Sequence, residues 1–157
     1  LWIRGPQVMA GYLNNPEASA QTLRNGWLHT GDVGVMDQDG FFYIVDRKND
    51  LLISGGYNVY PREVEDVLLA VPGVVEAAVV GIPDEHWGEM VVAVVAGAPG
   101  LDTGRIAEHA RAHLANYKRP KGILVWPELP KSAANKILRR TVRDRLIAEG
   151  YRPPGGQ

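Results

Sequence analysis

The chain has 157 residues, 45% of them hydrophobic, which is enough for one ordinary domain or two small ones with a real core. Its net charge of −1 creates no global field that would attract nucleic acid or an anionic membrane, so any anion site has to be local. The absence of cysteine excludes disulfides, thiolate catalysis and cysteine-ligated metals, and we expect a cytoplasmic protein. No apolar run approaches the roughly 20 residues of a transmembrane helix, and no signal peptide is recognisable.

Residues 1–45 predict a strand, a short helix and a hairpin. The chain begins at Leu1 in the strand-like "LWIRG", so we expect a piece of a longer protein. Residues 15–17, Asn-Pro-Glu, are a helix start, and that helix should stop near Asn25-Gly26. "VGVM" and "FFYIV" read as paired strands across the turn 37–40. This segment is too small to form its own core and should pack on residues that the chain lacks.

A charged segment, 46–50, then connects to a second body over 51–150. "LLISGGYNVY" predicts a strand, a glycine turn and a strand. Pro61 begins a helix with an apolar stripe at spacings of three and four, which comprises Val64, Val67, Leu68 and Val71. The runs "VEAAVVGI" and "MVVAVVAGA" are typical of central strands that are buried on both faces.

The last third of the chain predicts two more helices and one more strand. Residues 102–115 form a helix capped by Asp102, "GILVW" a strand, and "LPKSAANK" a polar loop. A helix over 137–149 should turn charges outward and three apolar residues inward, before ending at Gly150; the three are Leu138, Val142 and Leu146. We therefore predict an α+β fold, a small mixed sheet with helices preceded by a β-rich end piece, with a flexible tail at 151–157.

Three stretches of the chain, in this order, resemble the motifs of adenylate-forming enzymes: "GWLHTGD" (26–32), "DRKNDLLISGGYNVYPREVE" (46–65) and "LPKSAANKILRR" (129–140). This family includes acyl-CoA synthetases, luciferases and the adenylation domains of peptide synthetases. The resemblance implies that 1–45 is the C-terminal end of a large AMP-binding domain, 46–50 a hinge and 51–150 a mobile lid. The family's phosphate loop precedes these motifs and is absent from this chain.

The resemblance also implies a two-step reaction. A carboxylate attacks ATP, with Mg held by the missing N-terminal domain, to give an acyl-adenylate and pyrophosphate. The thiol of coenzyme A then displaces AMP after the lid has rotated. "ISGGYNVYPREVE" is more similar to fatty-acyl ligases than to peptide synthetases, so we expect a fatty acid and coenzyme A as partners, and no activity from this chain alone. An adenylation domain that serves a carrier protein, or a binding or regulatory module without chemistry, remains the alternative.

Two residues are assigned to ATP. Asp32 after Gly31 is most simply a turn-capping acid, but its carboxylate can also accept hydrogen bonds from both hydroxyls of a ribose, the role that the resemblance implies. Arg47 would support the same ribose, because the hairpin returns it to Asp32.

Lys136 is the implied catalytic residue, whose ammonium would offset charge on the carboxylate and the α-phosphate. A solvated lysine is the other interpretation, although a helix start disfavours a cation.

The resemblance places the hinge at Asn49, where the family commonly has Asp or Lys, and Asp50 or Lys48 could share the role.

Gly55 and Gly56 form a turn that leaves room for the pantetheine arm of coenzyme A. The coenzyme A nucleotide would be contacted by four residues, which are Trp87, Tyr117, Arg119 and Lys121. Packing against the apolar strands explains the two aromatic residues equally well. The histidines show no metal-ligand spacing, and we predict no metal site; they are His29, His86, His109 and His113.

Overall fold

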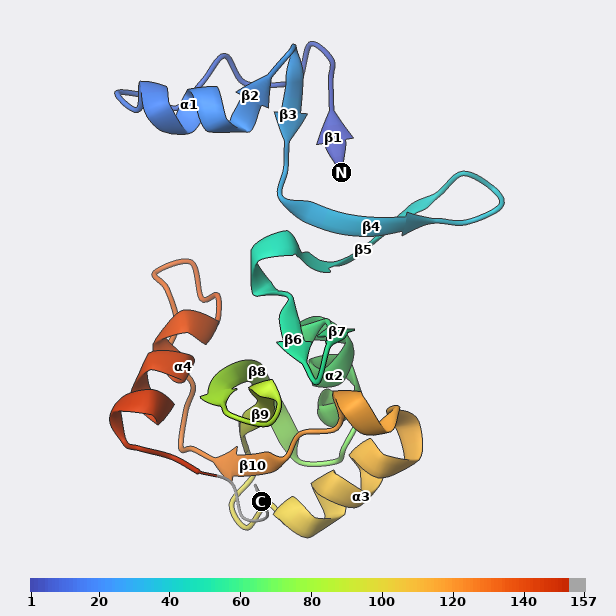
Figure 1. Cartoon of the computed structure of the whole chain (residues 1–157), viewed down its shortest axis with the longest axis vertical. Helices are drawn as coiled ribbons and strands as arrows, with labels where there is room; N and C mark the ends of the chain where they lie inside the picture. Colours follow the sequence, from blue (N-terminus) through green and yellow to red (C-terminus); the bar gives the residue numbers. More distant parts are fainter. Residues whose placement is uncertain (153–157) are drawn as a thin grey trace. The chain divides into compact units, whose positions relative to one another are not determined.

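The protein, in a computed structural model that describes residues 1–152, divides into two compact units with their boundary between Asn49 and Asp50 (Figure 1). This boundary lies inside the segment 46–50, whose function as a hinge stays a prediction. None of the helices in the described part is long and apolar enough to cross a membrane.

The first unit begins with a small antiparallel sheet in the order β1-β3-β2 and one helix. Their bounds are β1 Trp2–Ile3, α1 Pro16–Thr22, β2 Leu23–Arg24 and β3 Trp27–His29. The predicted cap is confirmed, since the Asn15 side chain accepts from the amide of Ala18 at 3.0 Å. The helix ends at Thr22, earlier than predicted, because Leu23 and Arg24 pair with β3. Asn25-Gly26, with φ of 52° and 76°, instead forms the turn of that hairpin.

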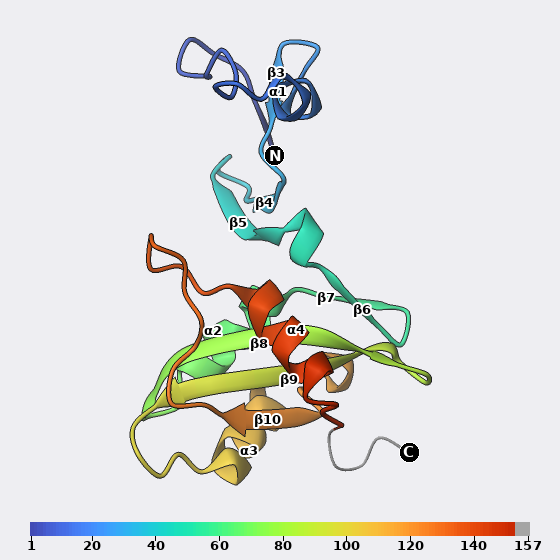
Figure 2. The same cartoon turned by 90° about the vertical axis from the view of Figure 1, so that its left-hand side faces the viewer.

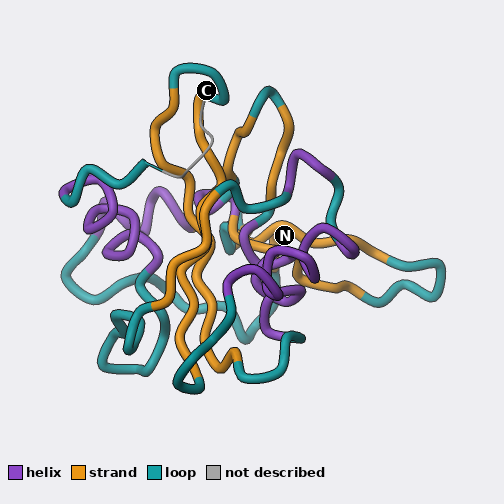
Figure 3. The backbone as a smooth tube through the Cα atoms, turned by 90° about the horizontal axis from the view of Figure 1, so that it is seen from below, coloured by secondary structure: helices purple, strands orange, loops and turns teal. Residues whose placement is uncertain are grey.

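The predicted hairpin of the first unit is confirmed as β4 (Asp32–Met36) and β5 (Phe42–Arg47), and Figure 3 shows it as a two-stranded ribbon closed by a loop. Asp37 organises that loop by accepting from the amides of Asp39 and Phe41 at 3.0 and 2.9 Å. Six large apolar residues of the hairpin are exposed, namely Val35, Met36, Phe41, Phe42, Tyr43 and Ile44. The described apolar residues that are buried all belong to the second unit, as expected for a first unit without its own core.

The second unit is built on a mixed sheet whose strands are β6 (Leu52–Ser54), β7 (Tyr57–Val59), β8 (Val74–Asp84), β9 (Gly88–Gly97) and β10 (Gly122–Val125). β9 lies between β8, which runs antiparallel to it, and β10, which runs parallel. The β6–β7 hairpin joins the start of β9 through the pair Ser54 and Gly88. The predicted α+β class is therefore confirmed.

Helices cover both faces of this sheet, with α2 (Pro61–Leu69) and α3 (Thr103–His113) on one face and α4 (Arg139–Ala148) on the other (Figures 1 and 2). Alternate residues of β9 enter the two cores, because successive side chains of a strand point to opposite faces. Val91, Ala93 and Val95 face α2 and α3, whereas Val92 and Ala96 face the α4 side. The prediction of strands buried on both faces is confirmed.

The ends of the later helices largely follow their capping residues. Asp102 caps α3 by accepting from the amides of Gly104 and Arg105 at 2.8 and 3.3 Å. Gly150, with φ of 64°, ends α4, and the amide of Tyr151 bonds back to the Leu146 carbonyl at 3.0 Å.

Two details of the last segment differ from the expectation. Val142 and Leu146 are fully buried as predicted, but Leu138 is 39% exposed because it precedes the helix as its N-cap. Tyr151, at the start of the predicted tail, packs against the core under α4. Arg152 is exposed, and residues 153–157 of the predicted tail lie outside the described residues.

Candidate functional site

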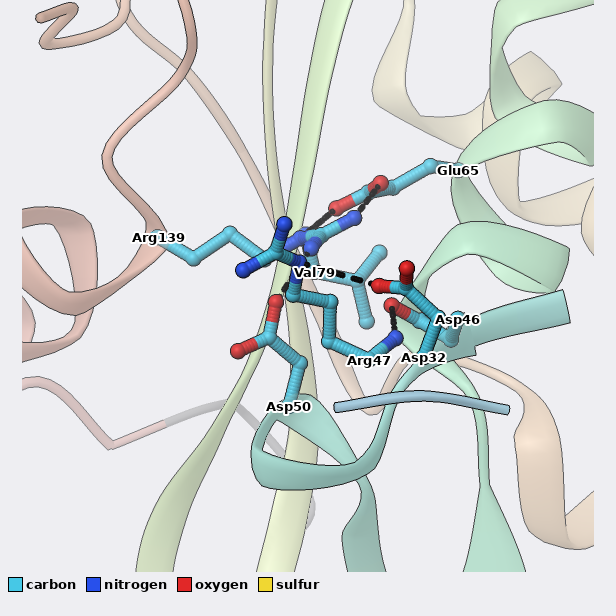
Figure 4. Close-up of polar contacts among 7 residues, drawn as sticks. All are labelled: Asp32, Asp46, Arg47, Asp50, Glu65, Val79 and Arg139. Carbon is cyan, nitrogen blue, oxygen red and sulfur yellow. Dashed lines mark hydrogen bonds and ion pairs between the residues drawn. The ribbon is translucent and has the colours of Figure 1, made fainter. Parts of the chain in front are cut away.

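Asp32 and Arg47 are register partners at the open end of the β4–β5 hairpin. The Arg47 Nε lies 3.3 Å from an Asp32 carboxylate oxygen (Figure 4), and their side chains are 68% and 21% exposed. The acid follows a tight turn in which Gly31 has φ of 77° and the Thr30 hydroxyl accepts from the Asp32 amide at 3.0 Å. The hairpin thus brings the two predicted nucleotide residues together, and the carboxylate keeps acceptor capacity for a ligand.

Lys136 lies at the end of a closed loop between two residues that form an isolated β-bridge, Lys131 and Ile137. The amide of Ser132 donates to the Lys136 carbonyl at 2.8 Å, and the amide of Lys136 donates to the Ser132 hydroxyl at 3.2 Å. Asn135 supplies the turn with φ of 57°. The Lys136 side chain is exposed, and its ammonium has no hydrogen bond or ion pair within residues 1–152. This cation is consequently fixed at its backbone and open to a ligand at its tip.

Both ends of this loop are held by carboxylates of the second unit. Glu76 on β8 pairs with Lys131 and accepts from the amide of Leu129 at 3.2 Å. The hydrogen bond from Lys131 holds the pKa of the Glu76 carboxyl below its usual value of 4.5. At the other end, Arg139 is bound by Glu65 and Asp50.

Gly55 and Gly56 form the two-residue turn between β6 and β7, with φ of 56° and 80°. A Cβ on Gly55 would lie 2.9 Å from the Trp87 ring, and the Gly55 amide donates to the Trp87 carbonyl at 2.8 Å. A Cβ on Gly56 would meet no atom within 4 Å. Packing against Trp87 therefore accounts for Gly55, whereas the backbone at Gly56 is open on its Cβ side.

The residues that were predicted to contact coenzyme A fall into separate local contacts. The Lys121 ammonium lies 4.6 Å over the Trp87 ring, and Tyr117 stacks on Tyr57 with ring centroids 4.6 Å apart. The Arg119 guanidinium donates to two carbonyls of the last turn of α3 and its C-cap, those of Arg111 and Leu114, both at 3.0 Å. Binding of coenzyme A by these side chains stays a prediction. The sequence did not indicate that Arg119 bonds to the C-terminal end of α3.

A pocket of about 480 Å³ lies beside α3 and β10. Its polar and charged lining includes Arg111, Asn116, Arg119 and Lys121. The predicted residues Arg119 and Lys121 therefore share one concave surface.

The predicted hinge residues lie in a short 3-10 turn, Lys48–Asp50. Asn49 is exposed and has no positive φ. Asp50 is bound to Arg139 at 2.7 Å.

Within residues 1–152 no cluster of three histidine or acidic residues is placed to hold a metal ion. His109 and His113 stack on each other with ring centroids 4.1 Å apart.

Residues 63–136 match a protein-family model described as the AMP-binding enzyme C-terminal domain. The chain is 47% identical over 147 residues to a 2-succinylbenzoate–CoA ligase of Bacillus cereus, covering 94% of this chain and 30% of that protein. It is 53% identical over 149 residues to a long-chain-fatty-acid–CoA ligase of Bacillus subtilis, covering 94% and 26%.

Among solved structures, the chain superposes on an o-succinylbenzoate CoA synthetase of Bacillus subtilis in complex with an acyl-adenylate intermediate, with a TM-score of 0.86 and 43% identity. That match covers 91% of this chain and 30% of the other. The architecture is thus that of an enzyme class that activates acids as adenylates. The chain belongs to the adenylate-forming enzymes and contains their C-terminal domain, and it spans about 30% of the length of the first of these ligases.

Proposed function

We propose that this chain is the lid-bearing part of an ATP-dependent acyl-CoA synthetase, which activates a carboxylic acid as an acyl-adenylate and transfers the acyl group to coenzyme A. One observation carries the proposal, namely a Lys136 ammonium that is exposed and, within residues 1–152, unpaired, on a loop anchored at both ends. The similarity to two acid–CoA ligases over nearly the whole chain supports it.

In the first step, Asp32 accepts hydrogen bonds from the ribose hydroxyls of ATP, and Arg47 orients that carboxylate from across the hairpin. Lys136 approaches the reacting carboxylate and the α-phosphate, where its charge offsets the negative charge that develops as the acyl–phosphate bond forms and pyrophosphate leaves. Mg accompanies ATP and is bound outside this chain.

In the second step, the segment 46–50 allows the second unit to rotate, with Asn49 as the pivot. The open backbone at Gly56 then faces the pantetheine arm of coenzyme A, and Trp87 with Lys121 contacts its nucleotide part. The thiol attacks the acyl carbonyl and AMP leaves. A carrier-protein thiol is the alternative acceptor.

We propose a fatty acid as the acyl substrate, in a cytoplasmic reaction. The 53% identity to the long-chain-fatty-acid–CoA ligase, compared with 47% to the 2-succinylbenzoate–CoA ligase, supports this choice.

The proposed function can be tested by grafting. The matching region of the Bacillus subtilis long-chain-fatty-acid–CoA ligase is replaced by this chain, and pyrophosphate release and acyl-CoA formation are measured with ATP, hexadecanoate and coenzyme A. We expect the graft to be active, and both this chain alone and the relative truncated before the graft point to be inactive. A folded graft that binds ATP but forms no acyl-adenylate would show that the chain is a binding or regulatory module.

Substrate and acceptor need separate measurements on the full-length protein that carries this chain. Turnover with hexadecanoate at least tenfold above that with 2-succinylbenzoate supports a fatty acid, and the reverse order contradicts it. Acyl transfer to a phosphopantetheinylated carrier protein in preference to free coenzyme A would identify the alternative acceptor.

A further inference from the structure

The C-terminal end of the Lys136 loop is held by Arg139, which begins α4 and contacts two acids (Figure 4). Its Nε and Nη2 donate to the two carboxylate oxygens of Glu65 at 2.7 and 2.5 Å, and its Nη1 donates to Asp50 at 2.7 Å. The Glu65 side chain is only 10% exposed and also accepts from the Val79 amide of β8 at 2.9 Å. The guanidinium is therefore fixed by a nearly buried carboxylate that is itself tied to the sheet.

The start of α4 depends on these acids more than an ordinary helix start does. Its N-cap is Leu138, which offers no capping side chain, and its first turn contains no acid. Two arginines, Arg139 and Arg140, instead lie at the positive end of the helix dipole. Glu65 and Asp50 supply the negative charge that the first turn lacks, so α4 should fray at this end without them.

The N-terminal end of the loop is held by a second, separate clamp. Lys131 pairs with Glu76, and these side chains are 30% and 20% exposed. The second oxygen of Glu76 accepts from the Leu129 amide, two residues earlier in the chain. Between the clamps, the backbone of Lys136 is bonded in both directions to Ser132. Because of these hydrogen bonds, a displacement of either end of the loop should also displace Lys136.

We propose that Arg139 and Lys131 are positioning residues for Lys136, each held by its own carboxylate, Glu65 and Glu76. This inference rests on the proposed function, because it assigns the two clamps to the adenylation step. Neither clamp residue touches ATP or the acid; each sets where the Lys136 ammonium stands. A displacement of about 1 Å at a reacting centre can lower a rate about a hundredfold, so small losses of clamp geometry should be visible in the first half-reaction.

The test uses four single variants of the graft. Arg139→Gln removes the charge of one clamp, and Arg139→Lys keeps the charge but loses the bidentate geometry. Glu76→Gln weakens the other clamp at a partly exposed site, so it remains informative should Arg139→Gln fail to fold. Arg140→Gln is the matched control, since Arg140 is the adjacent arginine, 93% exposed, with an Asp144 oxygen 3.9 Å away. Single-turnover rates are measured for adenylate formation and, from supplied acyl-adenylate, for thioester formation.

We expect adenylation to fall at least tenfold in Arg139→Gln and in Glu76→Gln, less in Arg139→Lys, and less than twofold in Arg140→Gln. Thioester formation should stay within threefold in all four. Equal losses in both half-reactions, or adenylation within twofold of wild type in the two stronger variants, would overturn the positioning role.

A second readout separates this inference from the proposed function. Amide hydrogen exchange at Asn135 and Lys136 is measured in the 157-residue chain itself, where no catalysis is involved. We expect faster exchange at these two amides in Glu76→Gln and Arg139→Lys, while β9 exchanges as in wild type. Unchanged loop exchange contradicts the clamps even when the graft is active. An inactive wild-type graft with the expected exchange changes contradicts only the proposed function and the assignment of the clamps to adenylation.

Discussion

The Arg47 Nε lies 3.3 Å from the Asp32 carboxylate, across the first registered pair of the β4–β5 hairpin. An ion pair whose arginine is 68% exposed contributes less than about 1 kcal/mol to stability. The pair is therefore a weak structural element and well suited to an interaction with a ligand, because a ligand can use the carboxylate without unfolding the hairpin.

This relationship leads to a first prediction about ATP. In the graft, Asp32→Asn should raise the KM for ATP at least tenfold, since a neutral amide accepts ribose hydrogen bonds less strongly than a carboxylate. Arg47→Ala should raise it less, and neither should change the melting temperature by more than about 3 °C. Arg24→Ala, an exposed arginine of the same unit, serves as the control. A KM for ATP equal to that of wild type in Asp32→Asn would leave Asp32 as a turn-capping acid.

The two glycines of the β6–β7 turn should respond differently to alanine. Both have positive φ, a conformation that costs a non-glycine residue about 1–2 kcal/mol. Gly55→Ala should cost more than Gly56→Ala, because its Cβ also meets the Trp87 ring at 2.9 Å. Urea unfolding of the 157-residue chain measures the order. In the graft, Gly56→Ala should slow thioester formation more than adenylation; the opposite result would remove this turn from the coenzyme A path.

The hinge assignment is tested by Asn49→Pro in the graft. Proline fixes φ near −65° and also restricts the residue before it, so the segment 46–50 loses conformations needed for rotation. We expect one half-reaction to fall at least tenfold further than the other, since in the proposed mechanism each requires its own orientation of the second unit. Asn49→Ala, which leaves φ free, is the control. Losses of equal size in both steps would move the pivot to Asp50 or Lys48.

The Glu76 clamp gives the second unit a defined dependence on pH. Hydrogen bonding from Lys131 lowers the pKa of Glu76 below 4.5, so the folded state favours the ionised form. The resulting stability is fully present above about pH 4.5 and is lost as the pH falls through the lower pKa of the folded state. Between pH 5 and 3, wild type should lose more stability than Glu76→Gln, measured by urea unfolding followed at β9 amides. Parallel curves would mean that Glu76 contributes no such linkage.

Local patterns in the sequence predicted most of the second unit, because the ends of its helices and the burial of its strands are determined by residues close together in the chain. Pro61, Asp102 and Gly150 mark helix ends through fixed φ, capping and positive φ respectively. The continuous apolar run of β9 follows from the burial of both its faces. The early end of α1 was missed because Leu23 and Arg24 continue a helical pattern and change conformation only through pairing with β3.

The ion pairs around the Lys136 loop could not be predicted in the same way, since they join residues far apart in the chain. Arg139 meets Glu65 across 74 positions and Asp50 across 89. One signal was available: Glu65 lies next to Val64 and three residues before Leu68, within the buried stripe of α2, and an acid in such a place needs a partner. The sequence does not say which cation supplies it.

Lys136→Ala in the graft should cripple adenylation and spare thioester formation from a supplied acyl-adenylate. The ammonium is exposed and unpaired within the described residues, so its loss should leave the stability of the second unit within about 0.5 kcal/mol. A preorganised charge at a phosphoryl centre contributes about 3 kcal/mol or more, which corresponds to at least a hundredfold in the first step. The KM for ATP should change far less, because Asp32 is the proposed ligand of the ribose.

Two further variants separate charge from packing at this position. Acetylation of Lys136 retains the aliphatic part of the side chain but removes its charge, and it should reproduce the alanine variant. Lys136→Arg keeps the charge on a larger group and should retain more adenylation activity than alanine. Single-turnover kinetics of the two half-reactions, run separately, decide between the assignments. If both steps slow alike in Lys136→Ala, the residue supports the loop and the cation that stabilises the first transition state lies elsewhere.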